Sequence, residues 1–407
     1  MPKIKKPIGI DVLTAARERV RYSFDHFEAI YVSFSAGKDS SVMLHLVMDE
    51  AIKRGRKVGV LFIDLEAQYA LTISHAEEMY RQYADHIEPY WVSLPIKLRN
   101  AVSNYEPIWC AWDPARKDDW VRQPPEHAIT DPKFFDFFEP WMEFEEFIEL
   151  FAVWYSKGRD TAAFIGIRAD ESLNRFRTIA IWDKEMHFGK RYTTKVIDRV
   201  YNVYPIYDWH VSDIWKYHAQ FPEKAYNQVY DRMHLAGLSP AQMRLCQPYG
   251  DDQRRGLWLF HLIEPQTWGR VVARVNGANT GALYVEETGN VSGYNKIHLP
   301  AGHTWKSFCN LLLSTMPEVT REHYLKRFRT WLRGWHERGY RNGIPDYAPR
   351  ELEKKYWAPS WRRLCKVLLR NDWWCKGLGL IQPKSAAYDR YMSIKRDRRA
   401  DKTAISV

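Results

Sequence analysis

Residues 35–41 read Ser-Ala-Gly-Lys-Asp-Ser-Ser, and these residue types suit the binding of an anion. Gly37 would let the backbone approach a ligand closely, and successive N–H groups at the start of a helix carry partial positive charge. Further donors come from Lys38 and from the hydroxyls of Ser35, Ser40 and Ser41. The pattern predicts phosphate binding, and we call this segment the phosphate loop. The alternative is an ordinary turn in which Asp39 or Ser40 caps a helix.

A second candidate segment, residues 166–172, reads Gly-Ile-Arg-Ala-Asp-Glu-Ser and follows an apolar run. Arg168 offers a planar, bidentate donor for phosphate or sulfate, and Arg175 and Arg177 would support it. The alternative is a plain helix start whose first turn carries two carboxylates.

A third segment, residues 204–215, reads Tyr-Pro-Ile-Tyr-Asp-Trp-His-Val-Ser-Asp-Ile-Trp. Here a structural interpretation outweighs a direct role in chemistry. Asp208 and Ser212 would cap a helix, and Trp209 and Trp215 would pack inside the domain.

Two carboxylates, Asp64 and Glu66, follow a continuous apolar run at residues 57–63. A carboxylate at such a strand end could bind a ribose or a metal ion. It could equally be a solvated strand end, and the sequence does not decide between the two.

The elements that must position these residues alternate between apolar strands and helices, which predicts a parallel α/β sheet covered on both faces. Ligands bind such sheets beyond the carboxyl ends of the strands, where the strand order reverses. Each of the candidate segments at 35–41, 64–66 and 166–172 follows a predicted strand. The predicted strands are 29–34, 57–64, 88–93 and 161–167, with helices at 11–28, 42–48 and 70–84.

The chain divides by composition into three predicted parts. Residues 1–225 form a nucleotide-binding domain, interrupted at about 100–150 by an aromatic insertion that makes a core or a lid. Residues 226–299 form a connecting α+β segment. Residues 300–407 form a helical domain with 23 Lys and Arg against 10 Asp and Glu, a net +13.

The basic C-terminal part also holds seven of the 18 tryptophans. Cations mixed with aromatic rings can bind nucleic acid through phosphate charge and base stacking. The positions expected to contact nucleic acid are Lys326, Arg327, Arg329 and Arg333. The competing interpretation is a solvated basic face over a tryptophan-filled core.

Taken in order, the three segments resemble the signatures of the PP-loop ATP pyrophosphatase and phosphoadenosine phosphosulfate (PAPS) reductase superfamily. The phosphate loop resembles S-G-G-x-D-S, with Ala36 in place of the first glycine. Residues 166–172 look like G-x-R-x-x-E-S, and residues 204–215 like P-x-x-D-W-x-x-x-D-V-W. The resemblance implies a HUP-like, doubly wound sheet of about five parallel strands, of the adenine nucleotide alpha hydrolase type.

The resemblance also implies ATP or PAPS as ligand, with Mg²⁺ carried by the nucleotide. Catalytic roles would fall to Lys38, Asp39 and Arg168. The expected nucleotide-binding residues are Ser35, Gly37, Lys38, Asp39, Ser40, Ser41, Asp64, Glu66, Gly166 and Arg168. The expected contacts to a second anionic group are Arg168, Glu171 and Arg175.

Thiol chemistry lacks its expected residue. PAPS reductases carry a nucleophilic cysteine in a Glu-Cys-Gly segment, and none of the five cysteines of this chain follows a glutamate. Cys246 is the one candidate we consider, and a buried structural role is favoured for it as well.

Over most of its length the chain further resembles the immunoglobulin-binding regulator A proteins of enteric bacteria and their prophages. That branch implies a ParB-like partner protein, DNA and a part in gene regulation. No run of about 18 apolar residues is present, so we expect no membrane span and a cytoplasmic location. The sequence thus favours an ATP-cleaving enzyme that adenylates an unknown acceptor, with a nucleotide-dependent regulator or a true PAPS reductase as alternatives.

Overall fold

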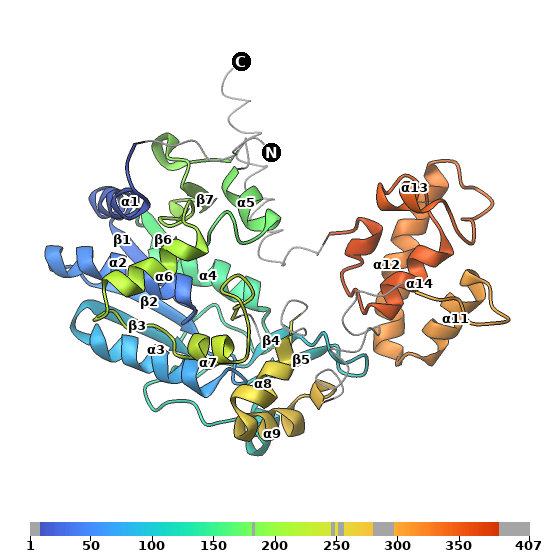
Figure 1. Ribbon diagram of the computed structural model, residues 1–407, viewed down its shortest axis with the longest axis horizontal. Helices are drawn as coiled ribbons and strands as arrows, with labels where there is room; N and C mark the ends of the chain where they lie inside the picture. Colours follow the sequence, from blue (N-terminus) through green and yellow to red (C-terminus); the bar gives the residue numbers. More distant parts are fainter. Residues whose placement is uncertain (1–8, 181–183, 246–248, 251–255, 280–296, 382–407) are drawn as a thin grey trace. The chain divides into compact units, whose positions relative to one another are not determined.

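The computed structural model describes residues 9–180, 184–245, 249–250, 256–279 and 297–381 (Figure 1). These residues fall into two compact units. Unit 1 comprises residues up to 97 and 110–245, and unit 2 comprises 98–109 and the described residues from 249 to 381. Cys246 lies outside the described residues. The boundaries expected at 225 and 299 stay predictions.

The centre of unit 1 is a mostly parallel six-stranded sheet in the order β3-β2-β1-β6-β8-β7. Five strands are parallel, and the edge strand β7 runs antiparallel to β8. The strand order reverses between β1 and β6, which confirms the predicted doubly wound α/β fold. The strands are β1 Ala29–Ser33, β2 Val58–Ile63, β3 Ile87–Val92, β6 Thr161–Ile165, β7 Thr193–Ile197 and β8 Val200–Val203.

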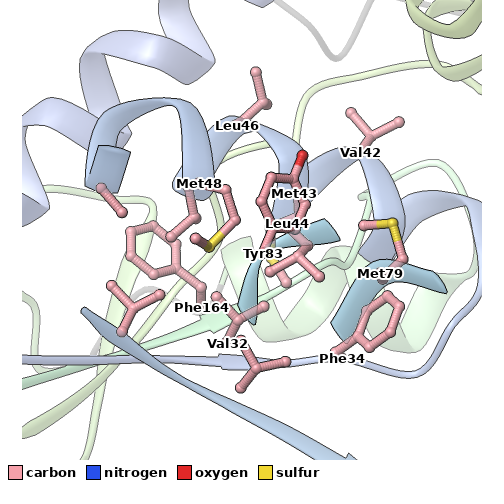
Figure 2. Packing of buried hydrophobic residues seen from close by; sticks show 14 of the residues in the cluster. Val32, Phe34, Val42, Met43, Leu44, Leu46, Met48, Met79, Tyr83 and Phe164 are labelled. Carbon is pink, nitrogen blue, oxygen red and sulfur yellow. The ribbon is translucent and has the colours of Figure 1, made fainter. Parts of the chain in front are cut away.

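Helices cover both faces of this sheet, because neighbouring side chains of a strand point to opposite sides. Ile30 and Val32 join a large apolar cluster with helix α2, which is buried along most of its length. Figure 2 shows side chains of α2 gathered with Val32, Phe164 and Met79. The helices of unit 1 are α1 Val12–His26, α2 Lys38–Arg54, α3 Ala70–Gln82, α4 Phe144–Ser156, α5 Leu173–Ala180, α6 Val211–Gln220 and α7 Val229–Leu235, with short 3-10 turns η1 Ala84–His86, η2 Pro114–Asp119 and η3 His187–Gly189.

The opposite face of the sheet meets helix α4, which belongs to the aromatic insertion. Tyr31 packs its ring against Tyr155 of α4 at a centroid distance of 5.3 Å. The Tyr155 hydroxyl donates to the carbonyl of Ile30 at 2.8 Å and accepts from the N–H of Gly59 at 3.0 Å. Helix α4 at the end of the insertion therefore packs as part of a core on this face of the sheet, which agrees with the core role rather than the lid role for this helix. The chain enters and leaves the first part of the insertion through the paired strands β4 Ile96–Arg99 and β5 Ile108–Ala111.

From residue 256 onwards, the regular elements in the described part of unit 2 are helices, and its core is rich in tryptophan and cysteine. Trp305, Trp331, Trp335 and Trp373 are buried together, whereas Trp357 is 65% exposed. The tryptophan-filled core is thus confirmed for these four residues. The helices are α8 Leu257–Ile263, α9 Pro265–Arg274, α11 Trp305–Thr315, α12 Glu318–Glu337, α13 Arg350–Lys354, α14 Trp361–Leu369 and the 3-10 turn η5 Lys376–Leu378. Within the described part of the chain, no helix is both long and apolar enough to cross a membrane.

Candidate functional site

The phosphate loop and the segment that follows β6 lie side by side at the point where the strand order reverses. Strands β1 and β6 are hydrogen-bonded neighbours, with Ser33 opposite Ile165. Directly beyond them, a Cβ atom on Gly166 would lie 3.0 Å from the Cα of Ser40. Only glycine allows this approach without a shift of the backbone. The structure thus brings together the phosphate loop and residues 166–172, and the third motif reaches them through His210, whose Nδ1 lies 3.0 Å from the Asp170 carboxylate.

Inside the phosphate loop, hydrogen bonds of the serine hydroxyls stabilise the turn. The hydroxyls of Ser40 and Ser41 each donate to the carbonyl of Gly37 at 3.0 Å, and the hydroxyls of Ser35 and Ser40 lie 3.0 Å apart. Gly37 is the N-cap of α2, and no side chain caps the helix there. The alternative in which Asp39 or Ser40 caps this helix is therefore wrong. The first N–H groups of α2 therefore have no side-chain cap, apart from the N–H of Lys38, which donates to the Tyr230 hydroxyl.

Arg168 and the charged residues of the loop form a compact network. The Arg168 guanidinium donates through Nε to Asp39 at 2.5 Å and through a terminal nitrogen to Asp170 at 2.6 Å. The ammonium of Lys38 lies 3.2 Å from Asp39. Arg168 and Lys38 are only 4% and 5% exposed. Two cations and two carboxylates thus hold one another in fixed positions at the switch point, where an anionic ligand of a doubly wound sheet would bind.

Three residues of the predicted connecting segment, Asn227, Tyr230 and Met243, complete the site. The Tyr230 hydroxyl accepts from the backbone N–H of Lys38 at 3.1 Å, and its ring lies 5.3 Å from the Lys38 ammonium. The ammonium also donates to the carbonyl of Met243 at 3.2 Å. Asn227 donates to the carbonyl of Ala36 at 2.9 Å. No sequence motif marks these residues, since all three hydrogen bonds use a backbone atom and join distant parts of the chain.

A pocket of about 170 Å³ opens beside this network. Arg244 lies on its wall and donates to the backbone carbonyl of Glu171 at 2.5 Å. Arg175 pairs with the Glu171 carboxylate at 3.2 Å and is not among the lining residues. The lining comprises Lys38, Arg168, Asp170, Glu171, Val211, Pro240, Ala241, Met243 and Arg244. The pocket therefore has a charged side and an apolar side.

Asp64 and Glu66 form hydrogen bonds and an ion pair that link the end of β2 to the insertion and to β3. Asp64 accepts from the indole nitrogen of Trp91 at 2.9 Å and forms an ion pair with Arg122. Glu66 accepts from the backbone N–H groups of Trp112 at 2.7 Å and Val121 at 3.2 Å. Both carboxylates are at most 1% exposed. Their positions favour a structural role over contact with a ribose, and the proposed nucleoside role stays untested.

The third motif fastens helix α1. Asp208 forms a two-pronged ion pair with Arg19, with both contacts at 2.7 Å. Trp209 is buried and donates to the carbonyl of Val12 at 3.0 Å. The predicted capping of α6 by Asp208 and Ser212 is wrong, because the N-cap is His210, whose N–H donates to Asp213. The structural interpretation of the motif nevertheless holds for Trp209.

Two buried histidines lie beside the loop helix. His75 Nε2 is 2.8 Å from the Ser41 hydroxyl, and His45 Nδ1 is 2.6 Å from the Tyr83 hydroxyl. Burial lowers the pKa of His75 to about 4 and that of His45 to about 3. Both rings are therefore neutral at physiological pH and act as hydrogen-bonding groups in the core.

The four cations expected to bind nucleic acid all lie on α12 of unit 2, but their environments differ. Lys326, Arg329 and Arg333 are exposed, and their spacing of three and four residues places them on one face of the helix. Arg327 is half-buried and donates to the carbonyls of Trp374 at 2.5 Å and Ile381 at 2.8 Å. Arg327 thus holds the fold of unit 2 together.

The geometry defines a doubly wound α/β protein with a cluster of charged side chains at the switch point. Comparison with known families agrees: a model described as "Phosphoadenosine phosphosulfate reductase domain" matches residues 29–236, and the chain belongs to that family. A second model, "Domain of unknown function (DUF3440)", matches residues 237–358.

Curated relatives extend the likeness over nearly the whole chain. The uncharacterized protein YbdN of Escherichia coli K12 is 43% identical over 390 residues, which covers 95% of each chain. The uncharacterized protein MJ0066 of Methanocaldococcus jannaschii is 29% identical over 204 residues, which is 50% of this chain and 34% of that protein.

Among solved structures, PAPS reductase from Candida auris in a phosphate complex is 13% identical, with a TM-score of 0.27 over 53% of this chain and 84% of that one. FMN adenylyltransferase from Candida glabrata in complex with ATP is 14% identical, with a TM-score of 0.32 over 54% of this chain and 57% of that one.

Proposed function

We propose that unit 1 binds ATP, with PAPS as the alternative nucleotide, and cleaves the bond between its α- and β-phosphates to adenylate an acceptor. The observation that supports this most directly is the meeting of the phosphate loop and Arg168 at the switch point of the sheet. There the positive end of α2, the ammonium of Lys38 and a guanidinium converge on one site.

The proposed roles follow from position. The β- and γ-phosphates bind to the phosphate loop through its N–H groups, Lys38 and the serine hydroxyls. Arg168 stabilises charge on the α-phosphate, and Asp39 and Asp170 keep its planar group oriented. An oxygen of the acceptor attacks the α-phosphorus, the bond to the bridging oxygen breaks, and pyrophosphate leaves with the electron pair.

Mg²⁺ belongs to this proposal only as a companion of the nucleotide. Within the described ranges, no group of three or more His, Cys, Asp or Glu side chains is arranged to hold a metal ion. Such an ion would therefore be held chiefly by phosphate oxygens, where it would offset their negative charge.

Thiol-dependent PAPS reduction has less support. Cys110, Cys309, Cys365 and Cys375 are buried, and none of them lines the pocket. Burial raises the pKa of the Cys375 thiol to about 12, which keeps it protonated and unreactive at neutral pH.

The test is release of pyrophosphate from ATP and Mg²⁺ by the purified chain. Lys38→Ala should reduce release by at least about tenfold, because it removes a charged donor worth roughly 1.5–3 kcal/mol. Lys53→Ala is the matched control, since Lys53 is exposed at the far end of the same helix. Equal release by the two variants, or no ATP binding by the wild-type protein, would overturn the proposal.

A second candidate is a nucleotide-dependent regulator that works in the cytoplasm with a ParB-like partner and DNA, in the manner of the immunoglobulin-binding regulator A proteins. The observation that favours it is the exposed row of Lys326, Arg329 and Arg333 on α12. Replacing all three by Glu should abolish salt-dependent DNA binding while the thermal melting temperature stays unchanged. Absence of DNA binding by the wild-type protein at low salt would refute this candidate.

A further inference from the structure

The pocket beside the phosphate loop contains one cation whose charge the surrounding carboxylates do not match. Lys38 lies 3.2 Å from Asp39, Arg168 lies 2.5 Å from Asp39, and Arg175 lies 3.2 Å from Glu171. Among the described residues, Arg244 has no carboxylate within ion-pair distance. Its contact is the neutral backbone carbonyl of Glu171.

Counting these groups gives the charge that a ligand should carry. Among the described residues that line the pocket, three are cations, Lys38, Arg168 and Arg244, and two are carboxylates, Asp170 and Glu171. One positive charge is left, and it belongs to a guanidinium at the pocket wall. A planar guanidinium is the group that best matches a carboxylate. A single surplus charge suits a singly charged group better than a doubly charged phosphate.

The apolar wall of the pocket indicates the chemistry of the rest of the ligand. Val211, Pro240, Ala241 and the Met243 segment present apolar atoms. The volume of about 170 Å³ is below the roughly 300–1,000 Å³ of pockets that take drug-sized molecules. A short aliphatic body fits these walls, and a second nucleotide does not.

We infer that this pocket holds the acceptor of the proposed reaction and that the acceptor is a small carboxylic acid bound by Arg244. The inference rests on the proposed adenylation. A carboxylate oxygen forms the new bond to the α-phosphorus, the bond between that phosphorus and the bridging oxygen breaks, and pyrophosphate departs. The product is an acyl adenylate, and no oxidant or reductant takes part.

The chain also links the two ligands. Met243 holds the Lys38 ammonium through its carbonyl, and the next residue, Arg244, lines the acceptor pocket. A nucleotide that draws Lys38 towards its phosphates releases this carbonyl, so binding of one ligand alters the position of the residue that receives the other. We therefore expect the affinities for ATP and for the acid to depend on each other reciprocally.

The experiment is ATP–pyrophosphate exchange by the full chain with acetate, propionate or butyrate as probe, and propionamide as the uncharged control. At least one acid should raise exchange about tenfold or more above propionamide. Arg244→Gln should raise the KM for that acid by about tenfold to a hundredfold, the effect of losing one charged hydrogen bond, while the KM for ATP changes less than about twofold. Arg232→Gln is the matched control, because Arg232 is exposed on α7 and does not line the pocket.

The outcomes separate this inference from the proposed function. Measurable ATP binding without exchange for any of the acids would overturn the carboxylate acceptor and leave nucleotide binding in place. An unchanged KM for the acid in Arg244→Gln would show that Arg244 does not bind the acid, even if exchange occurs. Failure of the wild-type protein to bind ATP would overturn both proposals. Both variants replace exposed side chains, and equal melting temperatures would show that they fold.

Discussion

The ends of two neighbouring strands in unit 1 carry carboxylates in very different surroundings. Beyond β1, the Asp39 side chain is 14% exposed and contacts two cations, Lys38 and Arg168, both of which line the pocket. Beyond β2, Asp64 and Glu66 are at most 1% exposed; Glu66 binds backbone N–H groups of the insertion, and Asp64 binds Arg122 of the insertion and Trp91 of β3. The carboxyl end of a parallel strand therefore does not by itself identify a binding residue. What distinguishes the two places is whether another part of the chain has already satisfied the charge.

The largest expected change in stability comes from replacing Asp64 by Asn, and replacing Asp39 by Asn is the comparison. Asp64→Asn should lower the free energy of unfolding by about 3–5 kcal/mol, because it leaves Arg122 half-buried without its charge partner. Asp39→Asn should cost less, about 1–2 kcal/mol, since Arg168 keeps Asp170 and Lys38 keeps the Met243 carbonyl, but it should abolish pyrophosphate release. Urea unfolding and a pyrophosphate assay separate the two effects. Equal losses of stability in the two variants would contradict the claim that Asp64 is structural and Asp39 is not.

Two glycines extend the comparison from carboxylates to packing. A Cβ on Gly59 in β2 would lie 2.8 Å from the ring of Tyr155, so Gly59→Ala should destabilise the protein by about 1–3 kcal/mol. A Cβ on Gly166 would instead press on the backbone of the phosphate loop, so Gly166→Ala should weaken ATP binding by more than it lowers stability. Gly269→Ala on α9 is the control, because nothing lies within 4 Å of the added atom. A stability loss in Gly59→Ala no larger than in this control would contradict the argument.

The sequence predicted the loop and four of the six strands, β1, β2, β3 and β6, because these depend on local patterns, but it did not predict β7 or β8. Apolar runs bounded by small residues place β1, β2 and β6, and the turn chemistry of residues 35–41 places the start of α2. It missed Tyr230 and Arg244, whose contacts with the site span about 70 to 190 residues of chain. It misjudged the capping by Asp208 because the partner, Arg19, lies 189 residues away. Side chains are assigned their partners by tertiary packing, and a single sequence does not show those contacts.

Acidic pH should weaken the core next to the phosphate loop, because that core contains the buried His75. Burial lowers the pKa of His75 to about 4, below its unfolded value of about 6.5, so the unfolded chain takes up a proton first as the pH falls. Stability from this group is full above about pH 6.5 and declines towards pH 4, by up to about 2 kcal/mol at pH 5. Urea unfolding at pH 7.5 and pH 5 measures the slope. His75→Gln should reduce this slope, with the remainder due in part to the buried His45, and an unchanged slope in this variant would assign the dependence to other groups.

The smallest expected effect lies in the phosphate loop itself. Ala36 has a φ of 55°, in the left-handed region that costs an L-residue about 1–2 kcal/mol. Ala36→Gly removes that strain, but it gives up a buried methyl group worth about 0.8 kcal/mol and increases the entropy of the unfolded chain by about 0.4–1 kcal/mol. The terms nearly cancel, so the free energy of unfolding should change by less than about 1 kcal/mol, with ATP affinity kept. Ala36→Val provides the contrast, since a β-branched residue at positive φ should lose both stability and ATP binding. A loss above about 2 kcal/mol in Ala36→Gly would show that this strand end, like that of β2, is held mainly by packing.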